Sequence, residues 1–140
     1  VHIKMGQFMS PESMRHAQDK VLSASETVSN IWLTERGTTF GYDYLMVDMT
    51  SMPKMRKFND NVIMDCTHSV QRPNQTDGTG GDPEMIETIA LSSIAAGATG
   101  LFLEVHPHPH LSSSDSTNIL QIDKLEGILE KCIRIKQAIS

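Results

Sequence analysis

The chain has 140 residues, of which 39% are hydrophobic, and a formal net charge of −5. This length is enough for one domain with a substantial hydrophobic core. The charges are spread over the chain without a basic stripe, which argues against nucleic-acid binding, and no apolar stretch approaches the ~20 residues of a membrane span.

Four short apolar runs predict β-strands, and a segment with helical character follows each of them. The strands are expected at residues 1–4, 31–34, 61–65 and 100–104, and the helices at 11–24, 52–58, 84–96 and from Asp123 onward. Ser10 and Pro11 are typical of a helix start, Gly97 of a helix end, and Asp123 is expected to cap the last helix. That helix has an apolar face made of Leu125, Ile128, Leu129, Cys132, Ile133 and Ile135. We expect loops at 37–44, 72–83 and 105–121, and a brief apolar segment at 45–49.

The alternation of strand and helix predicts parallel strands joined by crossover helices. Four such units in 140 residues amount to about half of a closed eight-unit barrel of ~250 residues, so we expect half of an α/β TIM barrel. An open doubly wound sheet is the alternative, but the glycine-rich phosphate turn usual after its first strand is missing. Because the chain begins at Val1 inside a strand, we expect it to be part of a longer protein.

The chain has two cysteines, Cys66 and Cys132, which are too few for a disulfide framework. Cys66 lies beside the charged end of the third strand, and Cys132 lies in the last helix. We expect both to be free thiols in a reducing cytoplasm.

Each predicted strand ends in polar or ionisable residues. Lys4 ends the first strand, Arg36 follows the second, His68 follows the third, and Glu104 ends the fourth. In barrels of parallel strands, catalytic groups lie at the carboxyl ends of the strands. The four strand ends therefore predict one active-site face.

The best candidate metal ligands are His68, Glu104 and Asp115. One imidazole and two carboxylates suit a divalent cation such as manganese, iron, cobalt or zinc. Spacing alone leaves open that these groups only cap and hydrogen-bond. His108 and His110 alternate with proline in a loop, so we interpret them as solvated surface residues.

Lys4 and Arg36 are cations at neighbouring strand ends, where a phosphorylated carboxylate would neutralise them. The alternative is that they pair with Glu35 or Asp65. Further candidate ligand contacts are the side chains of Gln7 and Gln71 and the backbone of Thr79, Gly80 and Gly81, which precede a helix and could bind phosphate.

Five segments together resemble the 3-deoxy-D-manno-octulosonate 8-phosphate synthase family. They are Ile3-Lys4-Met5-Gly6-Gln7-Phe8, Glu35-Arg36-Gly37-Thr38-Thr39-Phe40-Gly41-Tyr42, Val47-Asp48-Met49, Asp65-Cys66-Thr67-His68-Ser69-Val70-Gln71 and Leu101-Phe102-Leu103-Glu104-Val105-His106-Pro107. Leu125-Glu126-Gly127 of the last helix also fits, so the resemblance covers essentially the whole chain. One departure is Thr79-Gly80-Gly81-Asp82-Pro83, where the family usually has Ser-Gly-Gly followed shortly by Arg.

The resemblance implies a cytoplasmic, homotetrameric TIM-barrel transferase of lipopolysaccharide synthesis. Such an enzyme condenses phosphoenolpyruvate with D-arabinose 5-phosphate and releases phosphate. Residues 1–140 would supply strands five to eight and so form the C-terminal half of a single TIM-barrel catalytic domain. By the same resemblance, Lys4, Arg36 and His68 are the catalytic residues, Gln71 joins them at phosphoenolpyruvate, and His68, Glu104 and Asp115 hold the metal.

Other functions remain open at this point. Related enzymes make 3-deoxy-heptulosonate 7-phosphate or sialic acid, and whether this chain belongs to a metal-dependent or a metal-independent branch is decided outside it. A third possibility is an inactive half-barrel that acts only as an association module. We expect its edge strands at 1–4 and 100–104 to be unpaired, and its inner sheet face to be rich in Val, Ile, Leu and Met.

Overall fold

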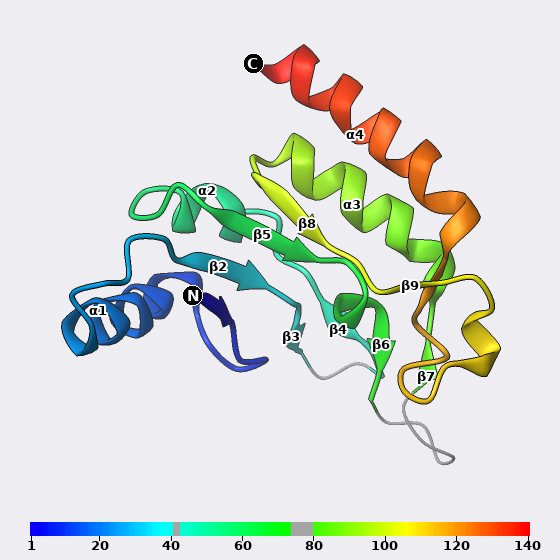
Figure 1. The fold of residues 1–140 in the computed structure, drawn as a ribbon, viewed down its shortest axis with the longest axis horizontal. Helices are drawn as coiled ribbons and strands as arrows, with labels where there is room; N and C mark the ends of the chain where they lie inside the picture. The colour runs from blue at the N-terminus through cyan, green and yellow to red at the C-terminus, as the bar shows by residue number, and fades with distance from the viewer. Residues whose placement is uncertain (41–42, 74–79) are drawn as a thin grey trace.

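The structure is a computed structural model that describes residues 1–40, 43–73 and 80–140 (Figure 1). Its main sheet has four parallel strands in the order β1-β2-β5-β8. These strands are β1 (His2–Lys4), β2 (Trp32–Glu35), β5 (Val62–Asp65) and β8 (Gly100–Phe102). The order follows the chain without reversal, as in a barrel and unlike a doubly wound sheet. The predicted alternation of parallel strands and helices is therefore confirmed.

The described residues form the α-helices α1 (Met14–Ala24), α2 (Ser51–Met55), α3 (Ile86–Ala95) and α4 (Leu125–Ile139). Short 3-10 turns precede α1, α3 and α4, at Pro11–Ser13, Pro83–Met85 and Ile122–Lys124. Among the described residues, no helix is both long and apolar enough to cross a membrane.

Two of the predicted helix signals are confirmed, and two predictions are wrong. The Ser10 hydroxyl accepts the N–H of Ser13, 3.3 Å away, and Gly97 ends α3 with a positive φ of 103°. Asp123 does not cap α4, because it lies within the preceding 3-10 turn and its carboxylate accepts the Gln121 amide instead. Helix α2 was expected to reach residue 58 but ends at Met55.

Among the described residues, three two-stranded pairs lie within or next to the segments that the sequence predicted as loops. Antiparallel pairs join β3 (Thr38–Thr39) to β4 (Leu45–Met46) and β6 (Gln71–Arg72) to β7 (Gly80–Gly81), and a parallel pair joins β9 (Val105–His106) to β10 (Leu120–Gln121). Two residues are too short to leave an alternating pattern, so sequence periodicity could not detect these strands.

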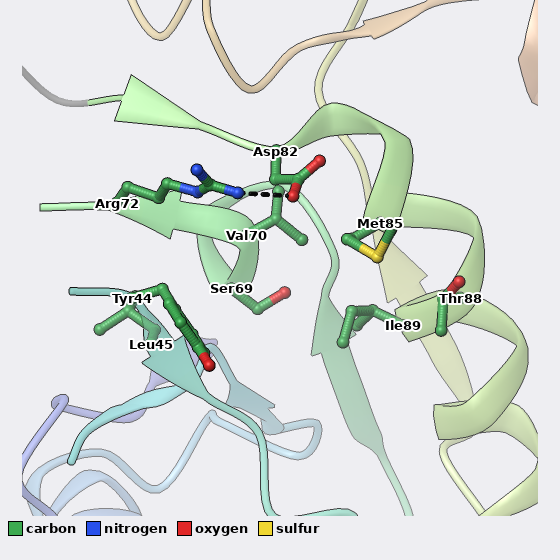
Figure 2. A pocket seen from close by; sticks show the side chains of 9 residues that line it. All are labelled: Tyr44, Leu45, Ser69, Val70, Arg72, Asp82, Met85, Thr88 and Ile89. Carbon is green, nitrogen blue, oxygen red and sulfur yellow. Dashed lines mark hydrogen bonds and ion pairs between the residues drawn. The ribbon is translucent and has the colours of Figure 1, made fainter. Parts of the chain in front are cut away.

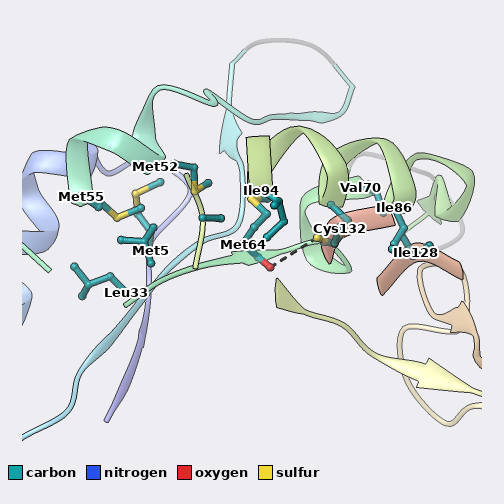
Figure 3. Close-up of a cluster of buried hydrophobic side chains, with 14 of the residues drawn as sticks. Met5, Leu33, Met52, Met55, Met64, Val70, Ile86, Ile94, Ile128 and Cys132 are labelled. Atoms are coloured by element: carbon teal, nitrogen blue, oxygen red, sulfur yellow. Dashed lines mark hydrogen bonds between the residues drawn. The ribbon is translucent and has the colours of Figure 1, made fainter. Parts of the chain in front are cut away.

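The aliphatic core lies on one face of the sheet, under the helices. Side chains alternate between the faces of a strand, so Leu33 and Met64 point to this side, where Ile86 of α3 and Ile128 of α4 join them (Figure 3). The opposite face carries His2, Lys4, Trp32, Thr34, Ile63, Asp65 and Phe102. The expectation of an aliphatic inner face was therefore wrong, because the aliphatic residues serve the helix side.

Gly81 of β7 packs directly against the loop before β10. A Cβ at this position would lie 1.4 Å from Oδ1 of Asn118, whose side chain is completely buried. We expect Gly81→Ala in the full-length protein to lower the free energy of unfolding by about 1–3 kcal/mol, as overpacking does. Urea unfolding measures this loss, and Gly127→Ala is the control, since no atom of the described residues lies within 4 Å of a Cβ there. Equal stability of Gly81→Ala and the unmodified protein would contradict this packing.

Candidate active site

Side chains from the carboxyl ends of all four parallel strands meet in one contact network. Asp65 at the end of β5 lies at its centre, with Lys4 from β1 on one side and His68 on the other. Glu104 follows β8, and Arg36 follows β2. The strand-end face predicted from the sequence is thus assembled in the structure.

The three candidate metal ligands converge. Nε2 of His68 lies 3.6 Å from a carboxylate oxygen of Glu104 and 3.9 Å from one of Asp115, and the three ligand atoms lie within 4.8 Å of one another. The hydroxyl of Thr67 accepts the backbone N–H of Glu104 at 2.8 Å and so holds the end of β8 beside the turn that carries His68. Asp115 has a positive φ of 49°. Non-glycine residues adopt this conformation rarely, and those that do are often found at functional sites.

This donor set fits a divalent metal ion. Bonds of about 2.1 Å place the ligand atoms of an ion roughly 3.0–3.5 Å apart, so the His68–Glu104 and His68–Asp115 separations of 3.6 and 3.9 Å would shorten around an ion. Nδ1 of His68 lies 2.9 Å from Oδ2 of Asp65, so an Nδ1–H can donate to that carboxylate. The lone pair of Nε2 then faces Glu104 and Asp115, as a metal-binding imidazole requires.

Arg36 brings a cation to the same network. Its Nη2 donates to the backbone oxygen of His68 at 3.1 Å and to the side-chain oxygen of Gln71 at 2.9 Å. Its buried Nε has no partner within the described part of the chain. Burial lowers the pKa of this guanidinium, against the opposing effect of Asp65 and other nearby carboxylates. An anionic ligand would supply the missing acceptor.

Among the described contacts, the Glu35 carboxylate binds the backbone of Arg36 and not its guanidinium. This carboxylate accepts the backbone N–H groups of Arg36 and Gly37, at 2.9 and 2.8 Å, and the Glu35 side chain is almost fully buried. Burial raises the pKa of Glu35, although hydrogen bonds from Ser51 and these two amides oppose the shift. The alternative considered from the sequence, an ion pair between Arg36 and Glu35, is therefore not seen among the described contacts.

Lys4 does have a carboxylate partner. Its Nζ lies 2.7 Å from Oδ2 of Asp65 and 4.4 Å from the centre of the Phe102 ring. The side chain is still 37% exposed, so the ammonium lies at the surface of the network. The pairing alternative considered for Lys4 is thus present, and its contact with a substrate stays a prediction.

The remaining candidate ligand contacts differ in whether they join the network. Gln71 joins the network, because its amide donates to Asp115 at 3.1 Å while its oxygen accepts Arg36. Gln7 instead accepts the hydroxyl of Thr39 in β3 at 3.1 Å. Gly80 and Gly81 form β7, and Thr79 lies outside the described residues.

Four residues outside the candidate set, two histidines and two cysteines, were also interpreted from the sequence. His108 and His110 are exposed, in keeping with their interpretation as surface residues. The thiol of Cys66 points into the core, 3.7 Å from the backbone oxygen of Met64, and burial strongly raises its pKa. Cys66 and Cys132 are both free, as expected.

Two residues of the network were not predicted as site residues. Asp65 was considered only as a possible counter-ion, and Thr67 was not considered. An aspartate three residues before a candidate metal-binding histidine, at the end of a strand, is the signal that could have identified Asp65, because such histidines usually donate their second N–H to a carboxylate.

A separate pocket of about 220 Å³ lies beside the network, lined by Tyr44, Leu45, Ser69, Val70, Arg72, Asp82, Met85, Thr88 and Ile89 (Figure 2). Arg72 and Asp82 form an ion pair of 2.8 Å at its edge. The buried hydroxyl of Ser69 has no partner among the described residues. Neither the metal-ligand candidates nor Lys4 and Arg36 line this pocket, so it is distinct from the candidate active site.

Comparison with known proteins supports the resemblance found in the sequence. A 2-dehydro-3-deoxyphosphooctonate aldolase of Desulfotalea psychrophila is 43% identical over 140 residues, which cover 99% of this chain and 49% of the relative. Aldolases of the same name from Koribacter versatilis and Bartonella henselae are each 42% identical, over 100% and 93% of this chain and 51% and 46% of their own lengths. The chain thus spans about half the length of the curated relatives it matches.

The resemblance to 3-deoxy-D-manno-octulosonate 8-phosphate synthases is confirmed, since 2-dehydro-3-deoxyphosphooctonate is another name for their product. The model of a TIM-barrel family matches residues 1–140 throughout. With the parallel strands in chain order and the relatives above, this match shows that the chain belongs to the DAHP synthetase I family.

Proposed function

We propose that this chain is the second half of a 3-deoxy-D-manno-octulosonate 8-phosphate synthase. The observation that carries the proposal is the strand-end network, in which a candidate metal triad lies next to an incompletely paired Arg36. Relatives matched over almost the whole chain carry the corresponding aldolase name. Residues 1–140 would supply strands five to eight of a single TIM-barrel domain in a cytoplasmic homotetramer that serves lipopolysaccharide synthesis.

In this proposal, phosphoenolpyruvate and D-arabinose 5-phosphate are joined with the addition of one water molecule. The methylene carbon of phosphoenolpyruvate attacks the aldehyde carbon of the sugar, and the carbonyl oxygen of the sugar becomes a hydroxyl. Water adds to the carbon that bears the phosphate, and inorganic phosphate leaves with cleavage of its C–O bond. The reaction therefore needs positioned anions, a polarised aldehyde and an oriented water.

The residues of the network can meet these needs. Arg36 offers Nε and its remaining donors to the carboxylate or phosphate of phosphoenolpyruvate, and Lys4 adds a second positive charge at the edge. Gln71 links Arg36 to Asp115 and so fixes the anion site relative to the triad. Manganese, iron, cobalt or zinc held by His68, Glu104 and Asp115 would supply Lewis-acid activation of the aldehyde or the water.

Related enzymes that make heptulosonate 7-phosphate or sialic acid differ in the sugar acceptor. A product of seven carbons needs an acceptor of four, and one of nine carbons needs an acceptor of six, whereas the octulosonate needs five. The test is an assay of the full-length protein with phosphoenolpyruvate and each class of acceptor, measuring phosphate release and product mass. We expect turnover with the pentose phosphate. Turnover only with a tetrose phosphate or an amino sugar would replace the proposed function, and none with any acceptor would refute it.

The anion site gives a direct prediction. We expect Arg36→Ala in the full-length protein to weaken phosphoenolpyruvate binding by about 1.5–3 kcal/mol, or about 10- to 150-fold, because a charge-assisted hydrogen bond in a buried site is lost. Calorimetric titration measures the change, and Lys4→Ala should also weaken binding.

The matched control for this titration is Arg56→Ala, which removes an arginine that pairs with Asp60 on the surface beyond α2. This variant should bind phosphoenolpyruvate as tightly as the unmodified protein. Unchanged affinity in both Arg36→Ala and Lys4→Ala would remove these two residues from the anion site.

A further inference from the structure

Asp65 is completely buried and makes four polar contacts at the centre of the network. Its Oδ1 accepts the backbone N–H groups of Thr67 and His68, at 3.1 and 2.9 Å. Its Oδ2 lies 2.9 Å from Nδ1 of His68 and 2.7 Å from Nζ of Lys4. Both oxygens of this carboxylate therefore face residues of the site.

These contacts define the position of the His68 imidazole. Oδ1 of Asp65 accepts the backbone N–H of His68, and Oδ2 contacts Nδ1 of its ring, so Asp65 fixes both the backbone and the side chain of His68. A carboxylate opposite Nδ1 can only accept, which requires the proton of a neutral ring to be on Nδ1. Nε2 is then left unprotonated on the side of Glu104 and Asp115.

We propose that Asp65 is the positioning residue of this site, which selects the Nδ1–H form of His68 and aims Nε2 at the two carboxylates. The ammonium of Lys4 contacts the same Oδ2 and offsets the charge of the buried carboxylate. The proposal deepens the proposed function, but it concerns the ligand site and does not depend on which sugar is the acceptor.

Glu35 provides a matched comparison within the same sheet. It ends β2 as Asp65 ends β5, it is buried, and it also accepts two backbone N–H groups. However, neighbouring residues of the paired strands place Glu35 on the helix side, in register with Met64, and Asp65 on the opposite side. A carboxylate that matters only for folding and one that positions His68 can therefore be distinguished by their amide variants.

The test uses Asp65→Asn and Glu35→Gln in the full-length protein. In Asp65→Asn, the amide oxygen can keep the two backbone N–H contacts, while the amide N–H₂ faces Nδ1 of His68 and favours the Nε2–H form. We expect the affinity for Co²⁺, titrated into the metal-free protein, to fall about 10- to 100-fold. Nitrogen-15 NMR of the imidazole, recorded in metal-free protein where the ring is neutral, should show the proton moving from Nδ1 to Nε2.

Glu35→Gln should change neither the Co²⁺ affinity nor the His68 signal. The proposal is overturned if the unmodified protein already carries the proton on Nε2, a measurement that does not depend on any variant folding. It is equally overturned if Asp65→Asn binds Co²⁺ normally, or loses affinity without the tautomer change. If the full-length protein failed the condensation assay while the Co²⁺ titrations and NMR spectra gave the results expected above, the proposed function would be refuted and the role of Asp65 would stand.

Discussion

Replacing His68 with alanine in the full-length protein is expected to abolish metal binding and condensation. His68 supplies the only nitrogen among the three converging candidate ligands of the described residues, and its Nε2 faces both carboxylates. Removing a residue that only hydrogen-bonds to a metal ligand typically costs 10- to 100-fold in affinity, so loss of the ligand itself should cost more than about 100-fold. Metal content after purification and titration of the metal-free protein measure this directly.

His108→Ala is the control for this experiment, because His108 is exposed in the loop between Glu104 and Asp115 and is not among the converging ligands. It should keep the full metal content. Glu104→Ala should lose metal as His68→Ala does. If both His68→Ala and Glu104→Ala retained the metal stoichiometry of the unmodified protein, the ligand assignment would be wrong.

The sequence predicted the main sheet because each strand lies in a short apolar run that a helical segment follows. Val62–Asp65, for example, is fully buried, and a short apolar run indicates a buried strand. The cap at Ser10 and the stop at Gly97 were predictable because both depend on local backbone chemistry. The β3–β4, β6–β7 and β9–β10 pairs were not, because strands of two residues are too short to leave an alternating pattern in the sequence.

Most residues of the candidate site were predictable from the sequence, but the contacts between them were less so. His68 and Glu104 were placed together because parallel strands end at one edge, a rule that needs no side-chain detail. The pairing of Lys4 with Asp65, and of Gln7 with Thr39, depends on side-chain geometry that spacing does not carry. Cys66 illustrates the same limit, since one step along a strand reverses the face to which a side chain points.

Residues 1–140 expressed alone are expected to associate or misfold and to have no condensation activity. Strands β1 and β8 are the edges of the main sheet, and unpaired strand edges recruit other chains. The sheet face opposite the helices leaves Trp32 46% exposed, and α4 leaves Ile133 56% exposed. In a closed barrel, the face that carries Trp32 would point to the barrel interior and be covered by the remaining strands.

The measurements are sedimentation of the isolated chain over a range of concentrations and a phosphate-release assay with phosphoenolpyruvate and arabinose 5-phosphate. The full-length protein at matched concentrations is the control and should be active. We expect no activity from the isolated chain because its main sheet supplies four strand ends, whereas the active-site face of a closed barrel is built from eight. A compact monomer that releases phosphate would contradict the half-barrel interpretation, since a complete site would then exist within these 140 residues.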